Sequence, residues 1–414
     1  MTLTDVQILF IVNYLHFVSS GLVAPSLPYH FVTNGGNQIL LGFLVSATYV
    51  CYKISRDFIA LFELRKKNVI TFCLYFSFIT FSVLVLFRNR WVIFADRVVY
   101  ALTNQITWFC KTYVGRTQPR SSYVKICNLL DIVNVIGTAT GALIGGYAFD
   151  FVQDFTLMAL AAALLTLLAL YFAQNIEPDP ISTRKRAEFF FDLPTIWYDR
   201  FVNLRETDYR EKWDSVLLIG VYTFSSTIYY SRYAFFVSWA YYSGTTVIGK
   251  AVAYQCVVKF IIHLLVPFFK IQIVKKTLFF NWCLIICALM ACALFVAPSM
   301  LAYNIIFVPL VVSYCFINEF LADDIFKFEH DVALGESVAT IRILVSGIGP
   351  ICFGILCHFY GRQALRVLLL FPIMALVHFV RMKIVGRESE FCGDSEEEEE
   401  EKEEEEEAQH YKND

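Results

Sequence analysis

The sequence predicts an all-α membrane protein with twelve transmembrane helices in two six-helix pseudo-repeats. Of its 414 residues, 57% are hydrophobic and 17% are charged, whereas soluble domains are about 45–50% apolar and about 25% charged. Twelve apolar runs, each near the length that spans a bilayer, follow one another along the chain. Basic residues gather in alternate connections between these runs.

The apolar runs form two sets of six, separated by a polar stretch. The runs lie at 7–31, 38–57, 69–87, 91–113, 123–149 and 155–175, and then at 215–240, 246–269, 277–297, 299–320, 332–358 and 364–385. We therefore predict four parts: an N-terminal bundle over 1–175, a cytoplasmic linker over 176–214, a C-terminal bundle over 215–387 and a disordered tail over 388–414.

Positive charge predicts the orientation. Lys and Arg gather in the connections between runs 2–3, 4–5, 6–7 and 8–9 and at the carboxyl end, whereas connections 1–2, 5–6, 7–8 and 9–10 carry none. Basic connections stay in the cytoplasm, so both termini are predicted to be cytoplasmic. The pattern does not distinguish a plasma membrane from an endolysosomal one.

The linker and the tail have unusual composition. In the linker, 184–186 is basic and 189–191 is aromatic, a combination typical of a helix lying in the membrane interface. A solvated linker is the alternative. The tail from Glu388 to Asp414 holds 15 acidic and 2 basic residues, and this self-repelling charge predicts disorder.

Small residues form a seam in the fifth run. Gly137, Gly141 and Gly145 recur on one helical face, with Gly146 beside them. In lipid such glycines let two helix backbones approach closely, so this seam is at least a generic packing face. In the second half, Gly349-Pro350 corresponds to Gly141-Ala142 at an offset of about 208 residues.

Residues 137–146 also resemble the fifth-helix signature G-x-x-x-G-P-x-x-G-G of the major facilitator superfamily, with Ala142 in place of the proline. Arg97 and the 347–350 stretch are similar to that family too, the latter to its tetracycline-resistance-like, multidrug-type branch. The 2–3 loop signature of the family is nearly gone. The resemblance implies two parallel six-helix repeats with a substrate site between them near the bilayer midplane.

Ionisable residues inside apolar runs are the candidates for function, because each costs at least about 2.5–3.5 kcal/mol at the bilayer centre unless it is paired or hydrated. The resemblance implies that helices 1, 4, 7 and 10 surround the cavity. The substrate-site candidates on these and neighbouring runs are Asn13, His16, Arg97, Asn104, Trp108, Tyr229, Arg232 and Arg342. Structural hydrogen bonding between helices is the alternative for each. The excess of cations over deep carboxylates favours an anionic substrate.

Asp131 and Lys259 are the candidates for coupling or gating. They lie about 13 Å and about 15 Å from the cytoplasmic ends of the fifth and eighth runs at 1.5 Å per residue, and the resemblance implies that these helices face each other. We expect the two side chains to bridge the halves and close the cytoplasmic side in an outward-open state. Two alternatives are that Asp131 pairs with Lys125 and that Lys259 extends toward the cytoplasm.

Other chemistry finds little support in the sequence. Residues 244–250 nearly match a phosphate-binding loop, but Ala251 replaces the required hydroxyl residue and no strand precedes it. The twelve cysteines are scattered through apolar segments, and no nucleophile–base pair or metal-ligand spacing is visible. We therefore expect no enzyme activity, no cofactor, no metal and no nucleic-acid partner.

The predicted function is transport of a small organic solute, with anions favoured, by secondary active or facilitative alternating access. Proton coupling through Asp131 or His16 is left open. The alternative is a transport-inactive receptor or scaffold that acts through its acidic tail. The expected partners are the solute, the lipid bilayer and, in a coupled mechanism, protons, and the protein is expected to be a monomer.

Overall fold

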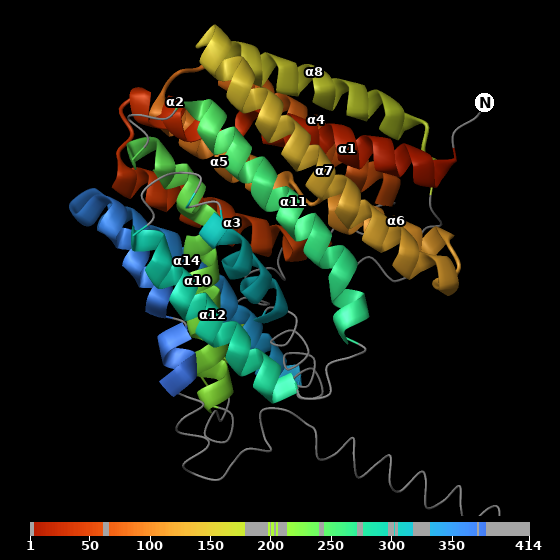
Figure 1. Cartoon of the computed structure of the whole chain (residues 1–414). Coiled ribbons are helices and arrows are strands. Elements are labelled where there is room, and N and C mark those ends of the chain that lie inside the picture. Colours follow the sequence, from red (N-terminus) through yellow and green to blue (C-terminus); the bar gives the residue numbers. More distant parts are fainter. Residues whose placement is uncertain are drawn as a thin grey trace, which may run out of the picture.

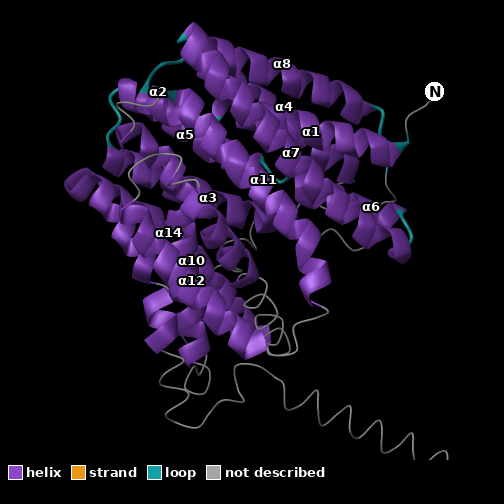
Figure 2. Ribbon diagram, viewed as in Figure 1, coloured by secondary structure: helices purple, strands orange, loops and turns teal. Residues whose placement is uncertain are grey.

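The computed structural model describes residues 4–60, 66–178, 213–239, 244–270, 276–296, 305–317, 332–370 and 372–377, with short pieces at 198, 200–202, 204–205 and 302. The described part is helical and contains no strand (Figure 2). The helices are α1 (Asp5–Val23), α2 (Leu27–Thr33), α3 (Gln38–Ala60), α4 (Lys66–Leu86), α5 (Arg90–Thr103), α6 (Ile106–Thr117), α7 (Arg120–Val152), α8 (Phe155–Gln174), α10 (Trp213–Trp239), α11 (Thr245–Lys270), α12 (Lys276–Val296), α14 (Val332–Tyr360) and the 3₁₀-helix η1 (Gly361–Leu369). Residues 305–317 are also helical.

The predicted membrane architecture is confirmed. Among the described residues, seven helical segments are long and apolar enough to cross a membrane, and shorter apolar helices lie at 216–229, 279–293 and 305–317. Each of the twelve predicted runs coincides with helical residues. The tail lies outside the described residues, and so does most of the linker with its predicted interfacial helix.

The first span consists of two helices. α1 begins with a capping box, in which the Thr4 hydroxyl accepts a hydrogen bond from the Gln7 N–H and the Gln7 side chain accepts one from the Thr4 N–H. The chain then turns at 24–26, and Pro28 lies in the first turn of α2, where proline needs no N–H partner. Ala24 of this turn and Pro28 of α2 form part of a cavity wall.

The fourth span is interrupted, so the apolar run over 91–113 forms two helices in place of one. Asn104 leaves the helical conformation with φ −86° and ψ 70°, and α5 and α6 meet at Asn104-Gln105. The side chain of Gln105 donates to Tyr52 O at 2.6 Å and to Ser55 Oγ at 2.6 Å. Polar contacts with α3 therefore hold the break inside the protein, where irregular backbone can be shielded from lipid.

The two halves of the chain meet mainly through two helix pairs. α7 packs against α1 within the first half and against α11 of the second half, while α3 packs against α14 (Figure 1). In Figure 1, α11 lies along α7, and α10, α12 and α14 lie together below the first half. The pairs α7–α11 and α3–α14 therefore define the boundary between the halves.

Glycines bring both of these pairs into backbone contact. Gly146 of α7 meets Gly249 of α11, and Gly42 of α3 meets Gly354 of α14. A Cβ on Gly146 would lie 3.2 Å from the Gly249 Cα, and one on Gly354 would lie 2.9 Å from the Gly42 Cα. The two contacts are related by about 208 residues of sequence, which is the offset of the predicted repeat. Gly249 also belongs to the false phosphate-loop match, so close helix packing explains that glycine.

The predicted seam packs inside the first half. A Cβ on Gly141 would overlap Val18 O of α1, and one on Gly145 would overlap Leu22 O. In the second half, a Cβ on Gly349 would lie 3.0 Å from Phe224 O of α10. The seam therefore holds α7 on α1, and its counterpart holds α14 on α10.

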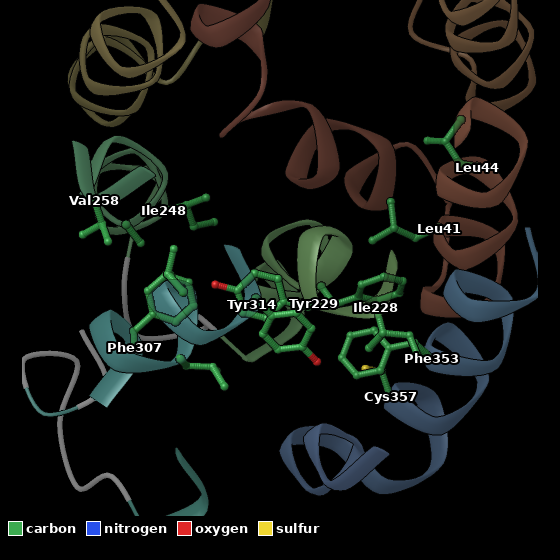
Figure 3. Packing of buried hydrophobic residues seen from close by; sticks show 14 of the residues in the cluster. Leu41, Leu44, Ile228, Tyr229, Ile248, Val258, Phe307, Tyr314, Phe353 and Cys357 are labelled. Atoms are coloured by element: carbon green, nitrogen blue, oxygen red, sulfur yellow. The ribbon is translucent and has the colours of Figure 1, made fainter. Parts of the chain in front are cut away.

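Aromatic and aliphatic side chains fill the second half up to the boundary. Tyr229 of α10 is fully buried, with its ring stacked on Tyr314 at 4.6 Å and on Phe307 at 5.6 Å between centroids. Figure 3 shows Leu41 and Leu44 of α3 in the same cluster as these rings. The core is thus continuous across the α3–α14 side of the boundary.

Candidate functional site

A cavity lies between the two halves, where the turn from α1 to α2 faces α10 and α11. Its volume is 290 Å³, near the lower end of the range of about 300–1,000 Å³ that is usual for small-molecule sites. The described lining residues are Ala24, Pro28, Ala234, Ile248, Val252, Gln255, Cys256 and Lys259. Lys259 alone among them carries a charge, so the cavity is mostly apolar with one cation.

Asp150 joins the halves at the end of α7 that the charge pattern places outside, which we call the outer end. Its Oδ1 accepts hydrogen bonds from Thr245 N at 2.8 Å and Thr245 Oγ1 at 2.6 Å, and its Oδ2 accepts one from Thr246 N at 2.8 Å. The Thr246 hydroxyl donates to Gly146 O at 3.3 Å, and the Thr245 hydroxyl oxygen lies 3.1 Å from the same carbonyl oxygen. A carboxylate here satisfies N–H groups at the start of α11 that have no helical partner and interacts well with the helix dipole.

On the opposite, predicted cytoplasmic side of α7, well inside the helix that begins at Arg120, Asp131 binds within its own half. Its Oδ2 lies 2.7 Å from Lys111 Nζ of α6, and 47% of the Asp131 side chain is exposed. The predicted bridge from Asp131 to Lys259 is therefore not formed in this structure, nor is the alternative pair with Lys125. Lys111 lies on α6, which extends to Thr117.

Arg97 binds a carboxylate that sequence reasoning missed. Its Nε and Nη2 donate to Asp96 Oδ2 at 2.9 and 2.7 Å, and the side chains are 7% and 2% exposed. The guanidinium also lies over the rings of Tyr100, at 4.7 Å, and Phe81, at 5.5 Å. Arg97 is thus neutralised inside the first half. The sequence did contain a sign of this ion pair, since Asp96 and Arg97 are adjacent within an apolar run.

His16 and Asn104 meet at the break between α5 and α6. The His16 Nε2 lies 2.7 Å from Asn104 Oδ1, and the ring is fully buried and stacks on Tyr100. Asn13 is also fully buried, and its Oδ1 accepts a hydrogen bond from Thr107 Oγ1 at 3.4 Å. The polar face predicted on the first helix therefore binds the fourth span.

The remaining substrate-site candidates lie in different surroundings. Tyr229 belongs to the aromatic core described above, and Trp108 is half-buried with its ring edge-on to Phe109 at 4.7 Å. Arg342 is half-buried on α14, and its backbone carbonyl accepts a hydrogen bond from Lys53 Nζ of α3 at 3.1 Å. The side chain of Arg232 lies outside the described residues. None of the substrate-site candidates is among the described residues that line the cavity.

Metal chemistry gains no candidate from the described residues, which contain no group of three or more His, Cys, Asp or Glu side chains able to hold an ion. The strongest candidate for a ligand site is the cavity beside Lys259.

No family model matches the sequence, and no curated protein is significantly similar to it. The structure, by contrast, is similar to solved transporters. The human organic anion transporter MFSD10 (TETRAN) superposes with a TM-score of 0.62 at 12% identity, covering 91% of this chain and 98% of that one. The nucleoside transporter NupG gives a TM-score of 0.67 at 15% identity, covering 92% and 99%.

A third similar structure is a bacterial homolog of the human lysosomal transporter Spinster, in an inward-facing and unoccupied conformation. Its TM-score is 0.65 at 13% identity, and 92% of this chain and 94% of that one are covered. The chain therefore has the fold of major facilitator superfamily transporters, as the resemblance at 137–146 predicted. Its placement in the tetracycline-resistance-like branch stays a prediction.

Proposed function

We propose that this chain, which has the major facilitator fold, is a secondary transporter that carries a small organic solute across a membrane by alternating access. The observation that carries the proposal is the cavity lined by Ala24 and Pro28 of the first half and by α10 and α11 of the second. A solute bound there touches both halves. Rocking of one half against the other would then expose it to each side in turn.

The contacts at the two ends of α7 support an inward-facing state. The outer end is tied to α11 through Asp150 and Gly146. The other end carries Asp131, which is satisfied by Lys111 of its own half and is half exposed. Under the proposal, the cycle requires the bonds of Asp150 to break when the outer end opens.

The charge of the substrate is the finer part of the proposal. Arg97 no longer supports an anion, because Asp96 neutralises it. The preference for an anion now rests on Lys259 in the cavity wall. The named functions of the similar structures include transport of organic anions and of nucleosides, which supports a small organic solute.

Proton coupling through His16 or Asp131 remains part of the proposal, with facilitated diffusion as its rival. His16 Nδ1 is buried without a hydrogen-bond partner in the structure, so protonating this ring would have to be accompanied by a change in its surroundings. Coupling would make solute accumulation depend on a pH gradient.

Uptake into proteoliposomes tests the proposal. Purified full-length protein would be assayed with labelled anionic, neutral and cationic solutes, with and without a pH gradient, against liposomes lacking protein. Saturable uptake of one class is expected, and accumulation driven by the gradient indicates coupling. Folded, monodisperse protein that moves none of the solutes would contradict the proposal and favour a receptor or scaffold acting through the acidic tail.

A further inference from the structure

We propose that the cavity beside Lys259 binds small monocarboxylates, with the ammonium group holding the carboxylate and the apolar wall holding the rest of the molecule. This inference rests on the proposed function and names the substrate class for its site. It also gives Lys259 a different role from the gate predicted from its depth in the sequence.

One face of α11 supplies most of the cavity wall. Ile248, Val252, Gln255, Cys256 and Lys259 recur every three or four residues, so they lie along a single side of the helix. Lys259 is near the middle of α11, and the residues before it lead toward the outer end. A solute held at Lys259 would thus extend along this face toward the turn between α1 and α2.

The apolar part of the wall comes from both halves. Ala24 and Pro28 face Ala234, Ile248 and Val252 across the cavity. These side chains offer no charge and no strong hydrogen-bond donor, so they suit a hydrocarbon or aromatic body. A solute with polar groups along its whole length, such as a sugar, would bind less tightly, because its hydroxyl groups would find no hydrogen-bond partners on this wall.

The acidic side chains described above do not favour a cationic substrate. Among the described residues, Asp96 binds Arg97, Asp131 binds Lys111 and Asp150 caps α11. None of these three carboxylates lines the cavity. A carboxylate solute, in contrast, would form a charge-assisted hydrogen bond with Lys259 in surroundings of low polarity, where such bonds are strong.

The volume of the cavity and the one charged side chain among its described lining residues narrow the substrate class further. A volume of 290 Å³ suits a small molecule. The Lys259 ammonium can donate to one carboxylate, whereas a dicarboxylate would bring a second charge into an apolar wall. Gln255, one turn before Lys259 on the same face, adds an amide that can donate to the second carboxylate oxygen.

Binding to the purified full-length protein in detergent tests the inference without the leak of weak acids through bilayers. The probes are hexanoate and phenylacetate, compared with hexanamide, phenylacetamide and hexylamine. We expect both carboxylates to bind, and to bind better than their amides and the amine. Lys259→Met should weaken carboxylate binding about tenfold or more, which is the effect expected for a lost charge-assisted hydrogen bond.

Lys250→Met is the matched control. Lys250 lies on α11 but is exposed, with its Nζ 4.9 Å from the centre of the Tyr147 ring, and does not line the cavity. Its loss should leave carboxylate binding unchanged. Lys259→Glu keeps a charge at the same place and should reverse the selectivity, so that hexylamine binds better than hexanoate.

Two results would overturn the inference. One is wild-type protein that binds the amides or the amine as well as the carboxylates. The other is a folded Lys259→Met or Lys259→Glu protein with unchanged preference. If neutral or cationic solutes are nevertheless taken up into proteoliposomes, the proposed transport function stands while the substrate class fails. If no solute is taken up by folded protein, the transport function itself fails.

Discussion

The two carboxylates of α7 that bind neighbouring helices, Asp150 and Asp131, are satisfied in different ways. At the outer end, Asp150 accepts hydrogen bonds from backbone N–H groups of α11, which belongs to the other half. On the predicted cytoplasmic side, Asp131 binds Lys111 of α6, which belongs to the same half. The first arrangement needs α11 in place and the second does not. Separating the halves therefore costs hydrogen bonds at the outer end and none from Asp131.

The largest loss of stability is expected at the Arg97–Asp96 ion pair. This pair lies within the first half, so movement of one half against the other need not break it. Arg97→Ala leaves the Asp96 carboxylate buried without its cation, which costs about 3–5 kcal/mol when a buried pair is broken on one side. Thermal unfolding of the purified protein should show a large loss of stability. Replacing both residues with methionine should recover part of it. Wild-type stability combined with lost uptake in Arg97→Ala would instead restore the substrate-site role predicted from the sequence.

The next largest effect should come from the glycine contact at the outer end. A Cβ on Gly249 would overlap Ala142 O of α7, so Gly249→Ala should separate α7 from α11. We expect this change to destabilise the state in which the outer end is closed by about 1–3 kcal/mol. The native thiol of Cys256 lines the cavity and reports this opening. Its alkylation by an impermeant reagent supplied only from the outer side of the membrane, read by mass spectrometry, should become faster.

Gly220→Ala is the control for this change. A Cβ on Gly220 would come no closer than 4.0 Å to Ile341 Cγ2, so this variant should label at the wild-type rate. Equal labelling of Gly249→Ala and wild type would mean that the glycine contact does not hold the outer end closed.

A smaller effect in the same direction is expected from Asp150→Ala. This change removes the cap from α11, and loss of a helix cap typically costs about 1 kcal/mol. Cys256 labelling should rise severalfold, because only the closed state contains this contact. Asp154→Ala is the matched control: Asp154 caps α8 through Thr156 N at 2.9 Å, within its own half, so its removal should not change labelling. Equal labelling of the Asp150→Ala and Asp154→Ala variants would mean that Asp150 does not help to hold the outer end closed.

The smallest effect is expected at the opposite end. The side chains of Lys111 and Asp131 are 29% and 47% exposed, and exposed ion pairs contribute about 0–1 kcal/mol. Lys111→Met should change stability and Cys256 labelling little. A large loss of stability or a large rise in Cys256 labelling would show that the Lys111–Asp131 pair also holds the halves together. Asp131 and Asp150 would then not differ in the way described above.

The sequence predicted the overall fold well because membrane architecture depends on simple quantities. Run length identified the spans among the described residues, and the glycine spacing at 137–146 matched a known signature. These features reflect requirements of the bilayer and of close helix packing, which do not depend on which helices meet.

The candidate site was predicted less well, because its chemistry depends on partners. The sequence predicted similar depths for Asp131 and Lys259, but depth says nothing about the face on which a side chain lies, and in the structure Lys111 binds Asp131. The break at Asn104-Gln105 was hidden inside a run that is apolar enough to read as continuous. The cap from Asp150 to α11 joins residues 95 apart in sequence, so no local pattern reveals it.

The break in the fourth span also bears on how the protein enters the membrane during synthesis. α5 and α6 have 14 and 12 residues, and each is shorter than the roughly 20 that cross a bilayer. Together they carry Asp96, Arg97 and Lys111, residue types that the translocon inserts at a cost of about 2.5–3.5 kcal/mol each at the centre of a helix. Residues 90–117 should therefore leave the translocon only once earlier helices are present to receive them: α4, which supplies Phe81 to Arg97, and α3, which binds Gln105. The order of synthesis delivers both helices first.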